Sequence, residues 1–386
     1  MVDTIKGWIE NNIKGDPIIW FIAISLSILS ILVVYSATGT LAYKSYGGNT
    51  EYFLFKQTFL VLLSLIAMWV AHRIDYKYYA KISRVALIVA ALLLLYTWFS
   101  GVNLNEATRW IEIPLINQQF QPSDFATFAL VINLASMLAK RQQNIADFKE
   151  SLIPILIWCG VIVGLIALSN FSSAALLFLT CMLLLFIGRV PVKYLFMLIV
   201  VGVLAGIIAF KIGERGETVV NRFENWLNPT EVSFQARQSY IAIATGGIAG
   251  KGPGQSDQRN FLPHPYSDFI YAIILEEYGL IGGILVVFLY LALLYRGMVT
   301  TAKSERPFGG LLSAGLSFAL VLQAMVNMGV AVGLGPITGL PLPFLSMGGT
   351  SLLFTGISLG IVLSVSRGEH TENLFRTKKK KAPQLA

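Results

Sequence analysis

The residues best suited to chemistry lie together in residues 246–279, where a glycine-rich polar loop leads into a long apolar run. Asp268 stands immediately before that run, and Glu276 and Glu277 lie inside it. This stretch combines flexible backbone, an acidic residue at an apolar boundary and charges in an apolar run. We therefore predict that it contains the functional site. Asp268 is equally suited to capping the helix that follows, because a side-chain oxygen there accepts from free backbone N–H groups.

The glycines offer backbone N–H groups that can cradle a phosphate, and they stand at Gly246, Gly247, Gly250, Gly252 and Gly254. They match neither a P-loop nor a dinucleotide fingerprint, because no strand precedes them and no Ser or Thr follows the Gly-Lys pair. Plain loop mobility is therefore favoured over phosphate binding, and both interpretations stay open.

The two glutamates are a stronger signal, because a charged side chain deep in a membrane costs roughly 2.5–3.5 kcal/mol. Glu276 lies eight residues beyond Asp268, about 12 Å deeper at the helical rise. Glu276 is rotated by about 80° around the helix axis from Asp268, whereas Glu277 lies on the opposite face. At most one of the two glutamates can therefore act together with Asp268. We expect structural hydrogen bonds in the bundle, with a proton path as the alternative.

The composition indicates what positions these residues. Of 386 residues, 55% are hydrophobic and 13% charged, where soluble domains carry about 25% charged residues. Cys159 and Cys181 lie in apolar runs without metal-ligand spacing, which favours buried thiols. The chain is predicted to be one all-α integral membrane domain, 1–386, with ten transmembrane helices. The predicted helices are 18–37, 53–71, 85–99, 125–138, 152–168, 172–187, 194–212, 269–295, 311–330 and 351–365.

The basic residues predict the orientation. Alternate short loops hold most of the Lys and Arg, whereas the opposite short loops hold only Lys44 and Arg109. This bias predicts a cytoplasmic N-terminal segment 1–17, containing a short interfacial helix, and a basic cytoplasmic tail 366–386. The lysines of that tail suit contact with anionic lipid, at about 1 kcal/mol per charge, rather than with nucleic acid.

The longest connection, 213–268, lies between the seventh and eighth predicted helices and is predicted to be extracytoplasmic. A connection of that length is usually functional. Residues 219–227 suit a short amphipathic helix that presents Arg222 and Trp226, and residues 235–244 suit a second.

Several motifs, in a fixed order, carry a resemblance over nearly the whole chain. Residues 261–283 read FLPHPYSDFIYAIILEEYGLIGG, residues 235–256 read QARQSYIAIATGGIAGKGPGQS, and residues 327–353 read NMGVAVGLGPITGLPLPFLSMGGTSLL. Shorter matches are Phe55-Lys56-Gln57, Thr108-Arg109-Trp110-Ile111, Gln121-Pro122-Ser123-Asp124-Phe125-Ala126 and Asn228-Pro229. In these motifs the chain resembles the SEDS family of cell-wall polymerases, whose architecture of ten helices with a large loop after the seventh is the one expected here.

The resemblance implies a peptidoglycan glycosyltransferase that polymerises lipid II into a growing glycan. The family's catalytic aspartate falls on Asp268, which would act as general base on the acceptor hydroxyl. The negative charge of the pyrophosphate leaving group would be balanced by Arg109, Lys56 or Arg222, or by a divalent metal ion, Mg or Mn, whose ligands cannot be assigned. For each of these basic residues, the alternative is a contact with a lipid phosphate. The implied substrate-binding residues are Lys56, Gln57, Arg109, Trp110, Gln121, Asp124, Arg222, Gln235, Gln238, Ser239 and Ser256. For Gln121, Gln235, Gln238 and Ser239 the alternative is packing of the loop on the bundle.

Two positions depart from the family pattern. Thr127 stands where many members carry a lysine, so a cation is missing one turn into the fourth helix and Lys56 is left to replace it. Asn170 stands where members often carry an acidic residue, which weakens any proposal for a metal or proton there. Neither departure touches Asp268.

Within the family, the spacing of residues 252–263 and the basic tail favour an FtsW-like role in septal synthesis over a RodA-like role in the side wall. The implied location is the bacterial inner membrane at the septum, with other division proteins. The implied partner is a class B penicillin-binding protein whose single span packs near Gly282-Gly283 and Gly309-Gly310. A lipid II flippase and a non-catalytic division scaffold are the rival functions.

Overall fold

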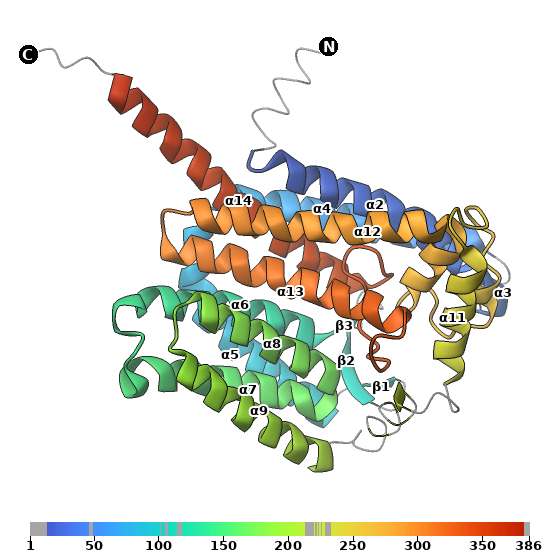
Figure 1. Cartoon of the computed structure of the whole chain (residues 1–386), viewed down its shortest axis with the longest axis horizontal. Coiled ribbons are helices and arrows are strands. Elements are labelled where there is room, and N and C mark those ends of the chain that lie inside the picture. Colours follow the sequence, from blue (N-terminus) through green and yellow to red (C-terminus); the bar gives the residue numbers. More distant parts are fainter. Residues whose placement is uncertain are drawn as a thin grey trace, which may run out of the picture.

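A computed structural model describes residues 14–45, 49–100, 102–104, 107–113, 118–212, 220, 222, 224, 226–227 and 233–381. Figure 1 shows a bundle of long helices in which the start of α2 and the end of α14 lie on the same side. The predicted N-terminal interfacial helix falls almost wholly in residues 1–13, and Asn228-Pro229 also lies outside the described residues.

Twelve helices of the described residues matter here. They are α2 Pro17–Ala37, α3 Gly39–Ser45, α4 Thr50–Arg73, α5 Tyr76–Ser100, α6 Pro122–Lys140, α7 Ile153–Ser169, α8 Phe171–Ile187, α9 Val192–Ile212, α11 Phe234–Gly246, α12 Ile270–Lys303, α13 Pro307–Ala331 and α14 Gly349–Lys381. A π-turn, Phe148–Leu152, leads into α7, and short 3-10 turns lie at Gln142–Asn144 and Gln258–Asn260.

Each predicted membrane helix falls on one of these helices and extends beyond it by at most one residue, but several predictions are too short: α5 begins nine residues before 85, and α12 continues eight residues beyond 295. Within the described residues, eight helices are long and apolar enough to cross a membrane, while Phe171–Ile187 and Val192–Ile207 are shorter apolar helices. The prediction of a mostly helical, multi-pass membrane protein is therefore confirmed, and the count of ten crossings stays a prediction. The predicted helix at 235–244 is α11.

Local sequence sets several helix starts. Proline occupies the first turn of α2, α6 and α13, where its missing N–H has no intrahelical partner to lose. Asp16 caps α2 by accepting from Ile18 N at 2.9 Å, and its carboxylate also pairs with Arg296 of α12. The two contacts tie the start of α2 to the far half of α12.

The contact between α4 and α14 depends on two small residues one turn apart. A Cβ added to Gly356 would lie 2.4 Å from the Ser64 carbonyl oxygen, and one added to Gly360 would lie 2.3 Å from that of Met68. Ser64 also donates to the Leu352 carbonyl at 2.6 Å. Because only glycine lets the two backbones approach so closely, these positions fix how α14 sits in the bundle.

The all-α prediction needs one correction, because a small antiparallel sheet occupies the connection before α6. It contains β1 Val102–Leu104, β2 Ala107–Ile113 and β3 Gln118–Phe120 in the order β1-β2-β3. Val102 lies opposite Trp110, and Ile111 lies opposite Phe120. Aromatic and β-branched residues favour such pairing, but strands this short give too little alternation to be predicted from sequence.

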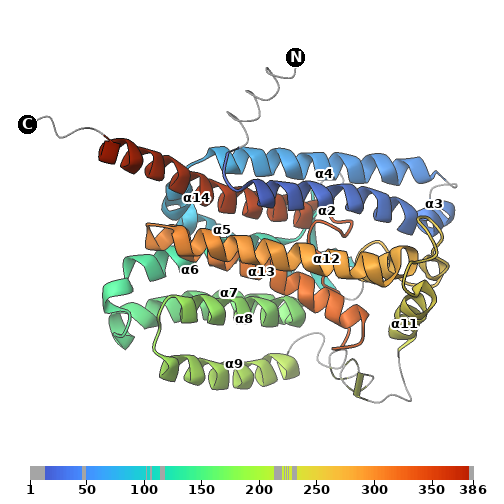
Figure 2. The same cartoon turned by 45° about the horizontal axis from the view of Figure 1, so that its top comes forward.

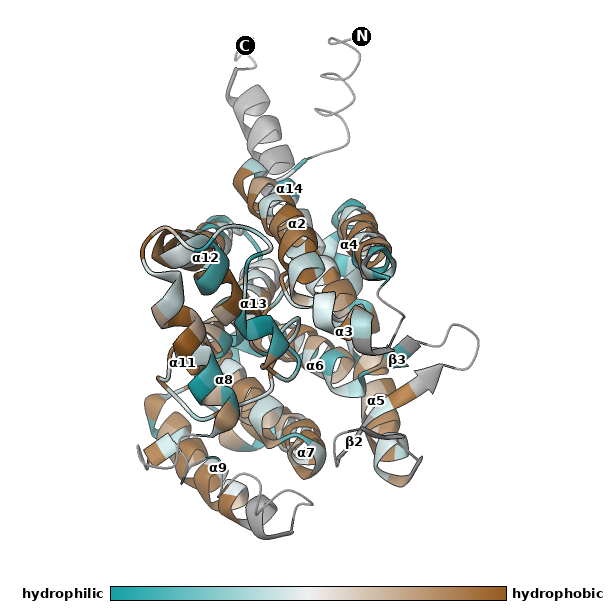
Figure 3. Ribbon diagram, turned by 90° about the vertical axis from the view of Figure 1, so that its right-hand side faces the viewer, coloured by the Kyte–Doolittle hydropathy of each residue, from teal (hydrophilic) through white to brown (hydrophobic). Residues whose placement is uncertain are grey.

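We call the end of the bundle opposite the start of α2 and the end of α14 the distal end; α3, α11 and the three strands lie there (Figure 1). Figure 3 looks onto this end and shows mostly apolar helices, with hydrophilic residues gathered in the loops between them. Helix α9 lies at the edge of the bundle beside α7 and α8 (Figures 1 and 2). Asp268 and its neighbours lie at the distal end, where α12 begins.

Candidate active site

The site is built around the non-helical connection between α13 and α14, residues 332–348, which we call the α13–α14 connection. Side chains of the bundle satisfy its backbone. Gln323 donates to the Pro341 carbonyl at 2.8 Å, and Ser30 of α2 donates to the Leu345 carbonyl at 3.0 Å. Irregular backbone inside a membrane bundle is tolerated only where the protein supplies such partners.

The backbone around Asp268 is fixed to this connection. Asn327 of α13 donates through its amide nitrogen to the Asp268 carbonyl at 3.0 Å and to the Leu340 carbonyl at 2.7 Å. Ser346 donates to the Ser267 carbonyl at 2.6 Å, and Met347 N donates to the carbonyl of the residue before it, Tyr266, at 2.9 Å. The carbonyls of three successive residues, 266–268, thus accept hydrogen bonds from the α13–α14 connection and Asn327.

The Asp268 carboxylate lies between Ser267 and the α13–α14 connection. It is half-buried, and its Oδ1 accepts from the Ser267 hydroxyl at 2.9 Å. A Cβ added to Gly339, whose φ is +66°, would lie 3.5 Å from its Oδ2. Burial, and secondarily the charge of Asp268, raises the pKa of the Tyr266 phenol. Tyr266 therefore stays a neutral hydroxyl beside the carboxylate at neutral pH.

The capping alternative for Asp268 is not what the structure shows. The N-cap of α12 is Phe269, and no side chain caps the helix there. The carboxylate is thus not engaged with the first free N–H groups of α12, so the helix itself gives no reason for an acid at this position.

Two further predicted residues lie near the α13–α14 connection. Arg222 contacts the connection itself and donates to the Ile337 carbonyl at 2.9 Å. Asp124 contacts the helix that follows it: Thr350, in the first turn of α14, donates to Asp124 Oδ2 at 3.4 Å. Gln121 donates to Ser123 at 2.9 Å at the start of α6. The connection therefore contacts Arg222 and the segment around Asp268, and Asp124 contacts the start of α14.

Three of the predicted substrate-binding residues are buried and bonded within the protein. Gln57 donates to Ser30 at 2.8 Å and lies beneath the α13–α14 connection. Ser239 of α11 donates to the Ala331 carbonyl at 2.8 Å, at the end of α13. Ser256 donates to Glu276. In this conformation these three side chains support the elements around the site rather than face solvent.

The other predicted contacts are half-buried: Lys56, Trp110, Gln235 and Gln238. Arg109 lies on β2, and its side chain is outside the described residues. Asn170, one of the two departures from the family pattern, is buried and accepts from Ser173 N at 3.3 Å as the N-cap of α8. An asparagine there has a local capping role that an acidic residue would also fill.

Across the described ranges, no group of three His, Cys, Asp or Glu side chains is placed to hold a metal ion.

Sequence reasoning missed the residues that hold Asp268. Asn327 and Ser346 belong to the motif that carried the resemblance, yet neither is acidic, basic or aromatic, so nothing in its type pointed to a role. The available signal was Asn327 itself, a polar amide in the apolar run 311–330 that requires partners.

The chain matches the "Cell cycle protein" family model, which covers FtsW, RodA and SpoVE, over residues 16–371. It is a member of that family of SEDS membrane proteins.

Curated relatives agree with this membership. The chain is 34% identical over 358 residues to a probable peptidoglycan glycosyltransferase FtsW of Geobacter metallireducens, covering 92% of this chain and 95% of the relative. It is 31% identical to stage V sporulation protein E of Bacillus subtilis, covering 92% and 98%.

Solved structures share the fold. A chain of a structure described as "Structural coordination of polymerization and crosslinking by a peptidoglycan synthase complex" superposes with a TM-score of 0.71 at 23% identity, covering 92% of this chain and 98% of that chain. The rod shape determining protein RodA of Thermus thermophilus superposes with a TM-score of 0.66 at 23% identity over the same shares.

Proposed function

We propose that this protein is a peptidoglycan glycosyltransferase that polymerises lipid II at the extracytoplasmic face of the bacterial inner membrane. The observation that carries the proposal is the position of Asp268: Asn327 and Ser346 fix the backbone around it, and its half-buried carboxylate accepts from the Ser267 hydroxyl beside Tyr266. Family membership and the FtsW names of the curated relatives give the reaction class.

The reaction needs a base at this position. Asp268 takes the proton of the acceptor sugar hydroxyl as that oxygen bonds to the anomeric carbon of the donor. The bond between the anomeric carbon and the pyrophosphate oxygen breaks, and undecaprenyl pyrophosphate leaves with the electron pair. A direct displacement inverts an α-linked donor into a β-linked glycan. Arg222, fixed at Ile337 on the same connection, is placed to balance the leaving group's charge.

The finer placement belongs to the same proposal. With ten crossings and cytoplasmic termini, the distal end and the 213–268 loop face outward, where the polymer is made. The FtsW names of several relatives favour a septal role with a class B penicillin-binding protein. A divalent cation would act with the pyrophosphate oxygens. The basic end of α14, residues 376–381, would contact anionic lipid of the inner leaflet.

The test is glycan synthesis by the purified protein with its transpeptidase partner, lipid II and Mg²⁺ or Mn²⁺, read on gels. Polymer is the expected result. In parallel, proteoliposomes with labelled lipid II report transport across the bilayer. Transport without polymer, under conditions where a related polymerase is active, would indicate a flippase. Neither polymer nor transport, with growth still dependent on the protein, would indicate a scaffold.

A further inference from the structure

Helix α12 is broken one turn after its two glutamates. Gly279 has φ 66° and ψ −168°, which separates residues 270–278, here called the short half, from residues 280–303. A break of this kind leaves carbonyl groups free at the end of one half and N–H groups free at the start of the next. Inside an apolar bundle these groups need other partners.

Residues 246–254, which we call the glycine loop, supply those partners on both sides. Lys251 N and Gly252 N donate to the carbonyls of Glu276 and Glu277 at 3.0 and 2.9 Å. In the other direction, Leu280 N donates to the Gly247 carbonyl at 3.0 Å, and the next residue's N–H bonds the Ile248 carbonyl at 3.2 Å. The glycine loop therefore completes the hydrogen bonding of both halves of α12.

Gly246 and Gly250 serve this contact, which corrects the favoured interpretation of loop mobility at these two positions. A Cβ added to Gly246 would lie 2.0 Å from the Leu275 carbonyl oxygen, and one added to Gly250 would lie 2.2 Å from that of Glu277. Gly250 also has φ +84°, a backbone conformation that other residues rarely adopt. The two backbones touch at these positions.

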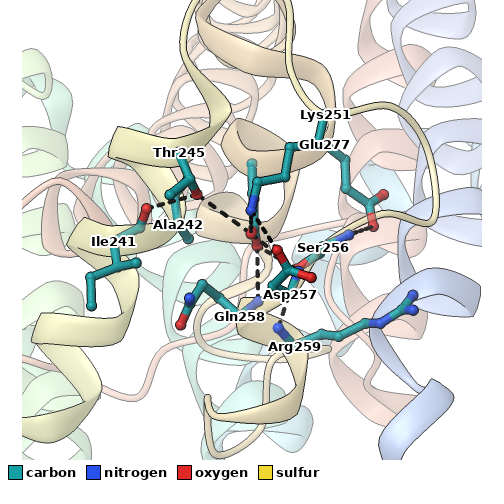
Figure 4. Close-up of polar contacts among 10 residues, drawn as sticks. Ile241, Ala242, Thr245, Lys251, Ser256, Asp257, Gln258, Arg259 and Glu277 are labelled. Carbon is teal, nitrogen blue, oxygen red and sulfur yellow. Dashed lines mark hydrogen bonds and ion pairs between the residues drawn. The ribbon is translucent and has the colours of Figure 1, made fainter.

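Glu276 fastens the chain that follows the glycine loop. It is fully buried and accepts from Lys251 Nζ at 2.6 Å, from the Ser256 hydroxyl, and from the backbone nitrogens of Asp257 and Gln258 at 3.1 and 3.2 Å. Figure 4 labels these four donor residues. The hydrogen bond to Glu276 is the main reason that the pKa of Lys251 is raised, so the cation is kept at neutral pH.

Glu277 fastens the same assembly to a third element, α2. It accepts from the Ser36 hydroxyl near the end of α2 and from Ser256 N at 3.4 Å. Arg259 donates to both the carbonyl and the hydroxyl of Ser36 at 3.2 Å. The short half of α12, residues 251–259 and the end of α2 are thus joined through two adjacent carboxylates.

Asp268 stands two residues before the short half, whose nine residues span about 13 Å. Asn327 and Ser346 fix the segment at its Asp268 end, and Glu276 and Glu277 fix it at its other end. We propose that Glu276 and Glu277 are positioning residues that lock the glycine loop into the break of α12 and thereby hold Asp268 at the acceptor hydroxyl.

The proposal rests on the proposed glycosyltransferase activity, and its test uses the full chain with its transpeptidase partner and lipid II. Lys251→Met and Glu277→Leu loosen the short half. Each is expected to lower kcat by about 10- to 100-fold, because misplacing a catalytic group by about 1 Å has an effect of that size. KM should stay near the native value, because these residues do not contact substrate in the proposal. Glu277→Gln, which keeps an acceptor for Ser36 and Ser256, is expected to rescue kcat.

Arg296→Met is the matched control for Lys251→Met. Arg296 also pairs with a buried carboxylate, that of Asp16 at 2.5 Å, but it lies in the half of α12 remote from Asp268. This variant should lose thermal stability and keep the native kcat. If Glu277→Leu does not fold, judged by size exclusion, Ser36→Ala removes the same hydrogen bond with a smaller change and should lower kcat without changing KM.

Each outcome separates this proposal from the proposed function. If Lys251→Met and Glu277→Leu lose stability as Arg296→Met does but keep the native kcat, the glutamates only stabilise the fold. That result would overturn their role in positioning Asp268. Failure of Glu277→Gln to rescue kcat would overturn it as well. Absence of polymer with the native chain would instead refute the glycosyltransferase activity itself.

Discussion

Replacing Asn327 by leucine should both destabilise the protein and slow it. The change keeps the side-chain volume but removes the amide nitrogen that donates to the carbonyls of Asp268 and Leu340. Each buried carbonyl left without a donor costs about 1–3 kcal/mol, so the two cost about 2–6 kcal/mol. Asn327 Oδ1 is itself buried without a partner among the described residues, so removing it returns about 1–3 kcal/mol.

The net loss expected for Asn327→Leu is therefore about 1–3 kcal/mol. The rate should fall further than this stability loss implies, because the freed peptide carries Asp268 and a shift of about 1 Å can cost up to about 100-fold. The assays are thermal unfolding in detergent and the initial rate of glycan synthesis, measured well below the unfolding temperature.

Gln323→Leu is the matched control, because it removes a similar donor from the Pro341 carbonyl in the same connection without touching Asp268. It should lower the unfolding temperature and leave most of the rate. Equal rates for the two variants, or a native rate in Asn327→Leu, would refute the claim that Asn327 holds Asp268 in place.

Three further outcomes are expected. Gly250→Ala should destabilise the protein far more than Gly254→Ala, since both have positive φ but only Gly250 lies against another backbone; equal unfolding temperatures would contradict the docked loop. Gly360→Leu should prevent stable packing of α14 on α4, read as loss of a monodisperse peak, whereas recovery of native protein would contradict that contact. Because the pKa of Lys251 is raised in the folded protein, its ion pair with Glu276 is complete below the ordinary lysine pKa of 10.5 and is lost only as pH rises through the higher folded value. Lys251→Met should therefore lower the unfolding temperature by the same amount at every pH from 6 to 9. A decrease that becomes smaller within that range would contradict this contribution of the ion pair.

The sequence was sufficient for the bundle and for the choice of Asp268 as the central candidate. Apolar runs of membrane length report helices directly, because lipid leaves few alternatives for the backbone. The partners of buried polar side chains were harder to predict. Glu276 and Glu277 were expected to make structural bonds, but nothing in their spacing indicated that a loop 20 residues earlier is their main partner.

The remainder could not be predicted because it depends on contacts between segments distant in sequence. The break at Gly279 is invisible in an apolar pattern, and the glycines of 246–254 look mobile until α12 is placed against them. Gln57 and Ser239 have the residue types of substrate contacts, yet their burial depends on where α2 and α13 lie. Asn327 reaches Asp268 across 59 positions in the sequence.

The general-base role of Asp268 is tested most directly by the rate of glycan synthesis by Asp268→Asn compared with Glu51→Gln, in the complex with the transpeptidase partner. Glu51 is an exposed carboxylate in the first turn of α4, also at the distal end. Loss of a general base is expected to lower the rate by about 100- to 10,000-fold in Asp268→Asn, with folding and lipid II binding retained and Glu51→Gln near native. Polymer formation by Asp268→Asn at the native rate would contradict the central claim.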